Sequence, residues 1–173
     1  TFKGWFTQST GGEKISTTTT MPANNVTYYA QWTANTYTIE YNANGGTGST
    51  VSSSHTYGVS KALTKNGFTK TGYTFAGWNT LSTGKGTSYN NSASVKNLSS
   101  KSGDTVTLYA KWTANTYTFK FDGNGSTSGS TDSKTWTYDK DCALPRNGFK
   151  KTGYTFAGWN TLANGKGTSY TNG

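Results

Sequence analysis

Short runs of alternating apolar and polar residues are the clearest pattern along the chain. In the run 35–46 (NTYTIEYNANGG), Tyr37, Ile39 and Tyr41 alternate with threonine and glutamate, and Asn-Gly-Gly follows. Alternation with a period of two indicates a half-buried β-strand, and the glycines tolerate the positive φ of a turn. The run 105–112 (TVTLYAKW) alternates in the same way. The sequence therefore predicts two strands that each bury one face.

The segment between these runs is expected to add two strands and one short helix. The run 54–63 (SHTYGVSKAL) predicts a strand that forms a hairpin with the first one. The run 72–78 (GYTFAGW) predicts a short strand that ends at a bend permitted by glycine. In 92–100 (SASVKNLSS), Val95 and Leu98 follow a possible serine cap at helical spacing, which predicts a short helix.

The whole pattern recurs with a period of about 80 residues. The segment GYTFAGWNTLSTGKGTSY at 72–89 returns almost unchanged at 153–170, and a related TFKGW opens the chain. A period of this length indicates modules with small cores of their own, not a solenoid. The expected domains are the C-terminal part of a shorter, truncated repeat at 1–32, a complete repeat at 33–112, and the N-terminal part of a third, truncated repeat at 113–173.

The two outer repeats are incomplete in this sequence. The first has a closing strand without an opening strand, and the third has the reverse. Half-modules leave apolar faces and strand edges uncovered, so we expect the natural chain to continue past both ends. The alternative is head-to-tail self-association, in which the closing strand of one copy completes the open sheet of the next.

Aromatic side chains must supply most of the core, because they make up 15% of the 173 residues and aliphatic residues are few. One aromatic side chain can bury ~150 to 250 Å². The residues expected in structural cores lie on the inward faces of strands or beside turn glycines: Trp5, Trp32, Trp78, Trp112, Trp159, Tyr37, Tyr41, Phe75, Phe119, Phe121 and Phe156.

No constellation of catalytic residues recurs with the repeat. Asp139 and Asp141 are the only close pair among the seven acidic residues, and their counterparts one period earlier are not acidic. A pair of carboxylates would thus serve one module only. His55 is the only histidine and is expected to face solvent, and Cys142, the only cysteine, excludes an intramolecular disulfide or a cysteine-based metal site. We expect no enzymatic activity, no cofactor and no metal.

A net charge of +9 makes salt-sensitive attraction to polyanions a candidate function. The candidate surface consists of basic residues around the GW segments and one tryptophan whose counterpart is His55: Lys65, Lys70, Lys85, Arg146, Lys150, Lys151, Lys166 and Trp136. The structural alternatives are a solvated basic face and a tryptophan packed in a loop. Nucleic acid is not expected, because basic residues are not concentrated beside exposed aromatic residues. No run approaches the ~20 apolar residues that a membrane span needs.

Four motifs carry a resemblance to a known family. In order along the chain, YNANGGTG, GFTKTGYTFAGWNT, GKGTSY and TVTLYAKW resemble the Listeria-Bacteroides repeat, the B-repeat of internalin B. The resemblance covers nearly all of 37–112, 117–173 and 1–32. It implies a strand-dominated α+β fold: tandem β-grasp (ubiquitin-like) modules of about 80 residues, with four strands and one short helix each. The first and last strands would lie side by side and parallel, and tandem modules would form an elongated rod.

The resemblance also implies a function without catalytic residues. Such repeats occur in secreted, often wall-attached surface proteins of bacteria, which implies an extracellular, adhesin-like protein of a Gram-positive bacterium. This segment would act as a spacer or stalk that projects binding domains, with neighbouring repeats of the same chain as its partners. The alternative is weak binding by the repeats of polyanions or glycans, such as teichoic acid or glycosaminoglycan, or of a host receptor.

Overall fold

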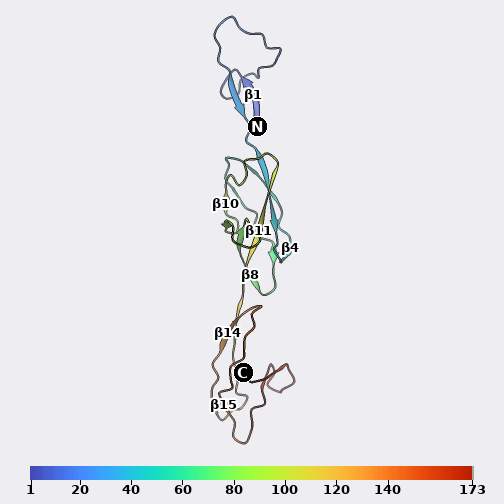
Figure 1. Ribbon diagram of the computed structural model, residues 1–173, viewed down its shortest axis with the longest axis vertical. Helices are drawn as coiled ribbons and strands as arrows, with labels where there is room; N and C mark the ends of the chain where they lie inside the picture. Colours follow the sequence, from blue (N-terminus) through green and yellow to red (C-terminus); the bar gives the residue numbers. More distant parts are fainter. Residues whose placement is uncertain (173) are drawn as a thin grey trace. The chain divides into compact units, whose positions relative to one another are not determined.

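The computed structural model describes residues 1–172, which form strands and no helix (Figure 1). The strand-dominated character expected from the sequence is therefore confirmed. The chain divides into two compact units. The first comprises Thr1–Lys70 and Phe75–Trp112, and the second comprises Thr71–Thr74 and Thr113–Gly173.

A five-stranded sheet with the order β5-β3-β11-β8-β9 is the main element of the first unit. Its strands are β3 (Thr36–Asn42), β5 (Ser53–Thr56), β8 (Tyr73–Asn79), β9 (Ser88–Tyr89) and β11 (Asp104–Ala114). The longest of them, β11, lies between β3 and β8. It runs parallel to β3, from Asp104 opposite Tyr37 to Tyr109 opposite Asn42. The opening and closing strands of the complete repeat are thus parallel neighbours, as the resemblance implied.

Three antiparallel pairs of short strands complete the first unit. They are β1 (Phe2–Phe6) with β2 (Tyr29–Trp32), β4 (Thr47–Gly48) with β7 (Phe68–Thr69), and β6 (Lys61–Ala62) with β10 (Ser94–Val95). The strand predicted at 54–63 is therefore two short strands, β5 and β6. Between them the chain turns at Gly58, where φ is +82°.

The short helix predicted at 92–100 was wrong. Ser92 and Asn97 have φ values of +58° and +60°, which lie outside the right-handed helical region. Between them, Val95 pairs with Lys61 in the β6–β10 ladder, and its side chain is buried. Strand pairing and two left-handed turns thus replace the helix that the spacing of Val95 and Leu98 suggested.

The core of the first unit follows the alternation of β3 and β11. Tyr37, Ile39, Leu108 and Ala110 are almost completely buried, whereas Glu40 on the opposite face of β3 is exposed. The inward and outward faces of these two strands are those that the alternation predicted.

Trp78 of β8 fills the middle of this core and has no exposed surface. Its ring centroid lies 4.7 Å from that of Tyr41, 4.9 Å from that of Phe75 and 6.1 Å from that of Phe68. Trp112 at the end of β11 is half-buried, and its indole N–H donates to the carbonyl oxygen of Ala43 at 2.9 Å. Aromatic rings thus hold the main sheet against the loops.

The second unit contains three separate two-stranded sheets. They pair β12 (Thr116–Phe119) with β14 (Lys134–Thr137), β13 (Ser128–Gly129) with β15 (Phe149–Lys150), and β16 (Trp159–Asn160) with β17 (Ser169–Tyr170), all antiparallel. Trp159 is buried and Phe121 is half-buried.

Four of the side chains expected in cores are exposed instead. Trp5 and Trp32 are 53% and 69% exposed, and Phe119 and Phe156 are 46% and 38% exposed. All four lie outside 33–112, in parts of the chain where no counterpart of the five-stranded sheet is present among residues 1–172. An inward-facing strand residue is buried only if another element covers that face.

Candidate functional site

The basic residues of the candidate polyanion surface are distributed over both units. In the first unit, Lys65 and Lys85 are exposed and Lys70 is half-buried. In the second unit, the exposed members are Arg146, Lys150, Lys151 and Lys166. The ammonium group of Lys151 donates to the carbonyl oxygen of Asn124 at 3.3 Å and lies 4.8 Å from the ring centroid of Tyr154. Most of this positive charge is therefore accessible to an anionic partner.

Trp136 packs within the second unit and does not project into solvent. Its ring centroid lies 4.2 Å from that of Phe119, and the residue is half-buried. Its indole N–H is buried and has no hydrogen-bond acceptor among residues 1–172. Trp136 thus packs against Phe119, and it is also one of the residues that line the open cavity of the second unit.

His55, which was expected to face solvent, is 1% exposed, so that expectation was wrong. The residue lies opposite Tyr37 in the β3–β5 pair, and the two ring centroids are 5.6 Å apart. Nε2 of His55 is 2.9 Å from the hydroxyl oxygen of Ser53, and the buried Nδ1 has no partner in the described part of the chain. Burial, with the nearby charge of Lys61, lowers the pKa of His55 below 6.5. A neutral imidazole thus serves as a core side chain here.

This lowered pKa predicts that the first unit loses stability in mild acid. The unfolded chain binds a proton near pH 6.5, whereas the folded unit resists protonation. The free energy of unfolding should therefore be at its full value above pH 6.5 and decrease between that pH and the lower pKa of the folded state. Urea unfolding at a series of pH values measures this effect. The control variant His55→Phe should lose much of the dependence between pH 7 and pH 5, and an unchanged pH profile in this variant would contradict the assignment.

The acidic pair noted in the sequence lies on the surface of the second unit. Asp139 and Asp141 are both exposed, and Oδ2 of Asp139 accepts a hydrogen bond of 2.9 Å from the hydroxyl of Tyr73. This hydrogen bond, with smaller contributions from burial and charge, raises the pKa of Tyr73. Among residues 1–172, no group of three or more histidine, cysteine, aspartate or glutamate side chains is arranged to hold a metal ion.

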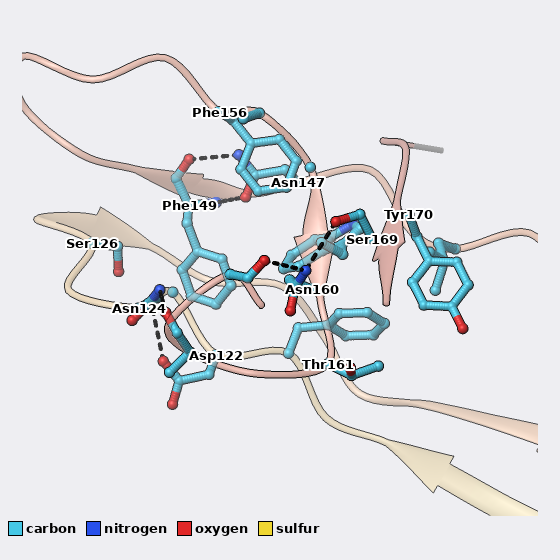
Figure 2. Close-up of a pocket in the computed structure, with 18 of the residues that line it drawn as sticks. Asp122, Asn124, Ser126, Asn147, Phe149, Phe156, Asn160, Thr161, Ser169 and Tyr170 are labelled. Atoms are coloured by element: carbon cyan, nitrogen blue, oxygen red, sulfur yellow. Dashed lines mark hydrogen bonds between the residues drawn. The ribbon is translucent and has the colours of Figure 1, made fainter. Parts of the chain in front are cut away.

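An open cavity of about 1210 Å³ lies in the second unit (Figure 2). Residues of β12, β14, β15, β16 and β17 line it together with residues of the connecting loops. Its apolar wall includes Phe119, Phe121, Phe149, Phe156 and Trp159. We call this feature the second-unit groove.

Asparagine side chains order the polar rim of the second-unit groove. The amide of Asn160 donates to Ser169 Oγ at 2.9 Å and to two glycine carbonyls in the adjacent loop (Figure 2). The amide of Asn124 donates to the carbonyl oxygen of Ala163 at 2.8 Å, while its backbone N–H donates to Asp122 Oδ1 at 2.7 Å. The sequence-based site prediction missed both asparagines, although each recurs one period away as Asn79 or Asn44.

The family model of the Listeria-Bacteroides repeat domain matches residues 1–31, 37–111 and 117–173. The chain belongs to the Listeria-Bacteroides repeat family. The resemblance seen in the sequence motifs is therefore confirmed. The middle match spans nearly all of the five-stranded sheet of this Listeria-Bacteroides repeat, and the third spans the second-unit groove.

Relatives of this Listeria-Bacteroides repeat chain include parts of much longer proteins. A protein of Evansella cellulosilytica, provisionally named a Gly-rich membrane protein, is 40% identical over 103 residues, which is 58% of this chain and 12% of that protein. A second protein of that organism, provisionally named a membrane protein, is 28% identical over 182 residues, covering 98% of this chain and 24% of the relative. Internalin H of Listeria monocytogenes is 36% identical over 118 residues, covering 66% of this chain and 19% of the relative.

This chain thus spans less than a quarter of the length of each of these relatives. No solved structure matched it. In the part of this Listeria-Bacteroides repeat chain that the structure describes, no helix has the length and apolar character that crossing a membrane requires.

Proposed function

We propose that this chain is a non-catalytic, extracellular segment of a bacterial surface protein and acts as a spacer that projects binding domains. The repeats are assigned to 1–32, 33–112 and 113–173, and a β-grasp relationship of the complete repeat is part of the proposal. Extracellular location is supported by likeness to internalin H and to two proteins named as membrane proteins. The spacer role is an inference about this chain and extends beyond those names.

The parallel pairing of β3 and β11 is the observation that carries the proposal. Because the two strands run in the same direction, the chain enters the complete repeat at one end of the sheet and leaves it at the other. Strands advance by ~3.3 Å per residue, so within the complete repeat the chain is carried along the length of the sheet between its entry and its exit. This geometry is consistent with a tandem segment that acts as a spacer.

The spacer proposal predicts an extended particle in solution. A compact globule of this length has a radius of gyration of about 16 Å. Small-angle X-ray scattering should give a value well above that figure, because successive repeats would be strung along the chain direction. A radius near the compact value would mean that the repeats fold back on one another, and the spacer proposal would then fail.

A second candidate function, weak binding of polyanions, is supported by the exposed basic residues in both units. We predict that the chain is retained on heparin at low salt and elutes as salt screens the interaction. The double variant Lys65→Glu, Lys70→Glu should elute at clearly lower salt. The reversal of Lys96 and Lys101, which are exposed and are not part of the candidate surface, is the matched control with the same change in net charge. Equal shifts in both double variants would indicate attraction by net charge alone, and no retention of the wild type would exclude the function.

A further inference from the structure

The compact units do not end at the boundaries of the repeats. Thr71–Thr74 belongs to the second unit, together with Thr113–Gly173, although the sequence pattern places these four residues in the repeat 33–112. They form a turn and the first two residues of β8. A short stretch of one repeat thus packs with the residues that open the next repeat.

Asn115, the residue between β11 and β12, forms hydrogen bonds to two segments of the second unit. Its backbone N–H donates to the carbonyl oxygen of Gly72 at 2.9 Å, and its Oδ1 accepts from the hydroxyl of Thr74 at 2.6 Å. Its own carbonyl oxygen accepts from the backbone N–H of Tyr138 at 2.8 Å. Because Tyr138 directly follows β14, Asn115 connects the turn before the GW segment to the β12–β14 pair.

The same contacts occur at the earlier linker, which lies wholly in the first unit. Both linkers have the sequence TANT, and Asn35 corresponds to Asn115. Oδ1 of Asn35 accepts from the hydroxyl of Thr1 at 2.8 Å, and its carbonyl oxygen accepts from the backbone N–H of Tyr57 at 2.8 Å. Thr1 opens the segment TFKGW as Thr74 opens TFAGW. Since the contacts form twice, they are a property of the repeat and not of one loop.

Aromatic packing also joins the turn to the residue after β14. The rings of Tyr73 and Tyr138 lie edge to face, with centroids 5.6 Å apart. Gly72 has a φ of +76°, and a methyl group added to it would overlap the ring of Tyr138. Its counterpart Gly153 has a φ of +77°, but no described atom lies within 4 Å of a methyl group added there. Close approach of Tyr138, and not backbone conformation alone, therefore requires glycine at position 72.

Asp139 adds a polar contact to this packing. Its Oδ2 accepts a hydrogen bond of 2.9 Å from the hydroxyl of Tyr73. The backbone φ of Asp139 is +55°, a conformation that few residues other than glycine adopt, and its counterpart Gly58 has a φ of +82°. The aspartate thus replaces a glycine at a position that favours glycine, and its carboxylate contacts the turn of the preceding repeat.

We propose that the turn at 71–74 is an interaction surface whose partner is the beginning of the following repeat. The linker asparagine supplies the hydrogen bonds, Tyr138 supplies the packing, and Asp139 supplies a contact that the earlier linker lacks because Gly58 stands at that position. The stability of the β12–β14 pair therefore depends on side chains of the repeat before it. This coupling requires the repeat boundaries proposed above and is independent of the spacer role.

Hydrogen exchange of the ¹⁵N-labelled chain, read at the amide of Tyr138, tests the coupling. Gly72→Ala should accelerate this exchange by about tenfold or more, because the added methyl group displaces the Tyr138 ring. Gly153→Ala is the matched control, since it places alanine at the same φ with no neighbour to displace, and it should accelerate the exchange less than about threefold. Equal acceleration in the two variants, or none in Gly72→Ala, would overturn the proposal.

Two milder substitutions test the polar contacts without adding bulk. Thr74→Val and Tyr73→Phe each remove one hydroxyl from the turn, and each should accelerate exchange at Tyr138 by about threefold or more. Their controls are Thr155→Val and Tyr154→Phe, the same changes one period later, which should leave that exchange unchanged. If neither variant of the turn exceeds its control, the β12–β14 pair does not depend on the preceding repeat and the proposal fails.

A double-mutant cycle tests the contact of Asp139 separately. In a chain that carries Asp139→Gly, the additional change Tyr73→Phe should have little further effect on exchange at Tyr138, because its hydrogen-bond acceptor is already absent. The indole signals of Trp78 and Trp159 report whether both units keep their fold. The same acceleration by Tyr73→Phe with and without Asp139 would contradict the role assigned to the carboxylate.

Discussion

Replacing Trp78 with alanine should cost the first unit about 3 to 5 kcal/mol of unfolding free energy, the range for large aromatic residues in cores. Trp78 has no exposed surface and contacts the rings of Tyr41, Phe68 and Phe75. The substitution therefore leaves a cavity whose walls come from three different segments and cannot easily close. Since small domains are stable by only ~5 to 15 kcal/mol, this substitution would remove a large share of the stability of the first unit.

Urea unfolding of the full chain, followed through the NMR signals of Ile39 and Leu108, measures this loss for the first unit alone. Trp32→Ala is the matched control, since it removes the same side chain from a position that is 69% exposed. That control should change the unfolding free energy of the core of the first unit by less than ~0.5 kcal/mol, as surface substitutions usually do. Similar losses in the two variants would contradict the assignment of Trp78 as the centre of the core.

Asn79→Ala is expected to have the second-largest effect, a loss of about 3 kcal/mol or more in the first unit. The fully buried amide donates to the carbonyls of Gly84 and Gly86 and to Ser88 Oγ at 3.2, 3.0 and 2.9 Å. Its Oδ1 accepts from the backbone N–H groups of Leu81 and Gly86 at 2.9 and 3.0 Å. Alanine would leave several of these groups buried without partners, at ~1 to 3 kcal/mol each.

The second unit provides a matched control for this substitution. Asn160 makes the corresponding five hydrogen bonds, at 2.9 to 3.1 Å, but is only half-buried. Water can replace a lost partner at such a position, so Asn160→Ala should destabilise its own unit less than Asn79→Ala destabilises the first. Thermal unfolding of both variants, read from NMR signals of each unit, compares the two losses. An equal or larger loss of stability for Asn160→Ala would show that burial of the asparagine does not determine how much stability is lost.

Local pattern was sufficient to place the long strands of the complete repeat. The alternation around Tyr37 and Ile39 predicted β3 and its buried face, and that around Leu108 predicted β11. The turn after β3 was also predictable, because Asn44 and Gly45 adopt the positive φ values that Asn-Gly favours. These features depend on residues close together in the sequence. The alternation of apolar and polar residues indicates which side of the strand is buried.

Predictions from local sequence were wrong where pairing with a distant segment determined the structure. Val95 and Leu98 had helical spacing, yet the ladder between β6 and β10 determined the conformation of that segment. His55 looked like a solvent-facing residue, but its position opposite Tyr37 places it against the core. Neither partner is near in the sequence, so neither outcome could be read from local propensity.

The sequence by itself determined the repeat, the absence of a recurring catalytic constellation, and which face of each long strand is apolar. Only the tertiary structure decided whether such a face is covered. Ile39 and Phe119 occupy the same position in two copies of one pattern, yet the first is 0% exposed and the second 46%. The physical reason is that burial needs neighbours on several sides: Ile39 lies beside β11 and within the core cluster of the first unit, whereas Phe119 is in a two-stranded sheet among residues 1–172.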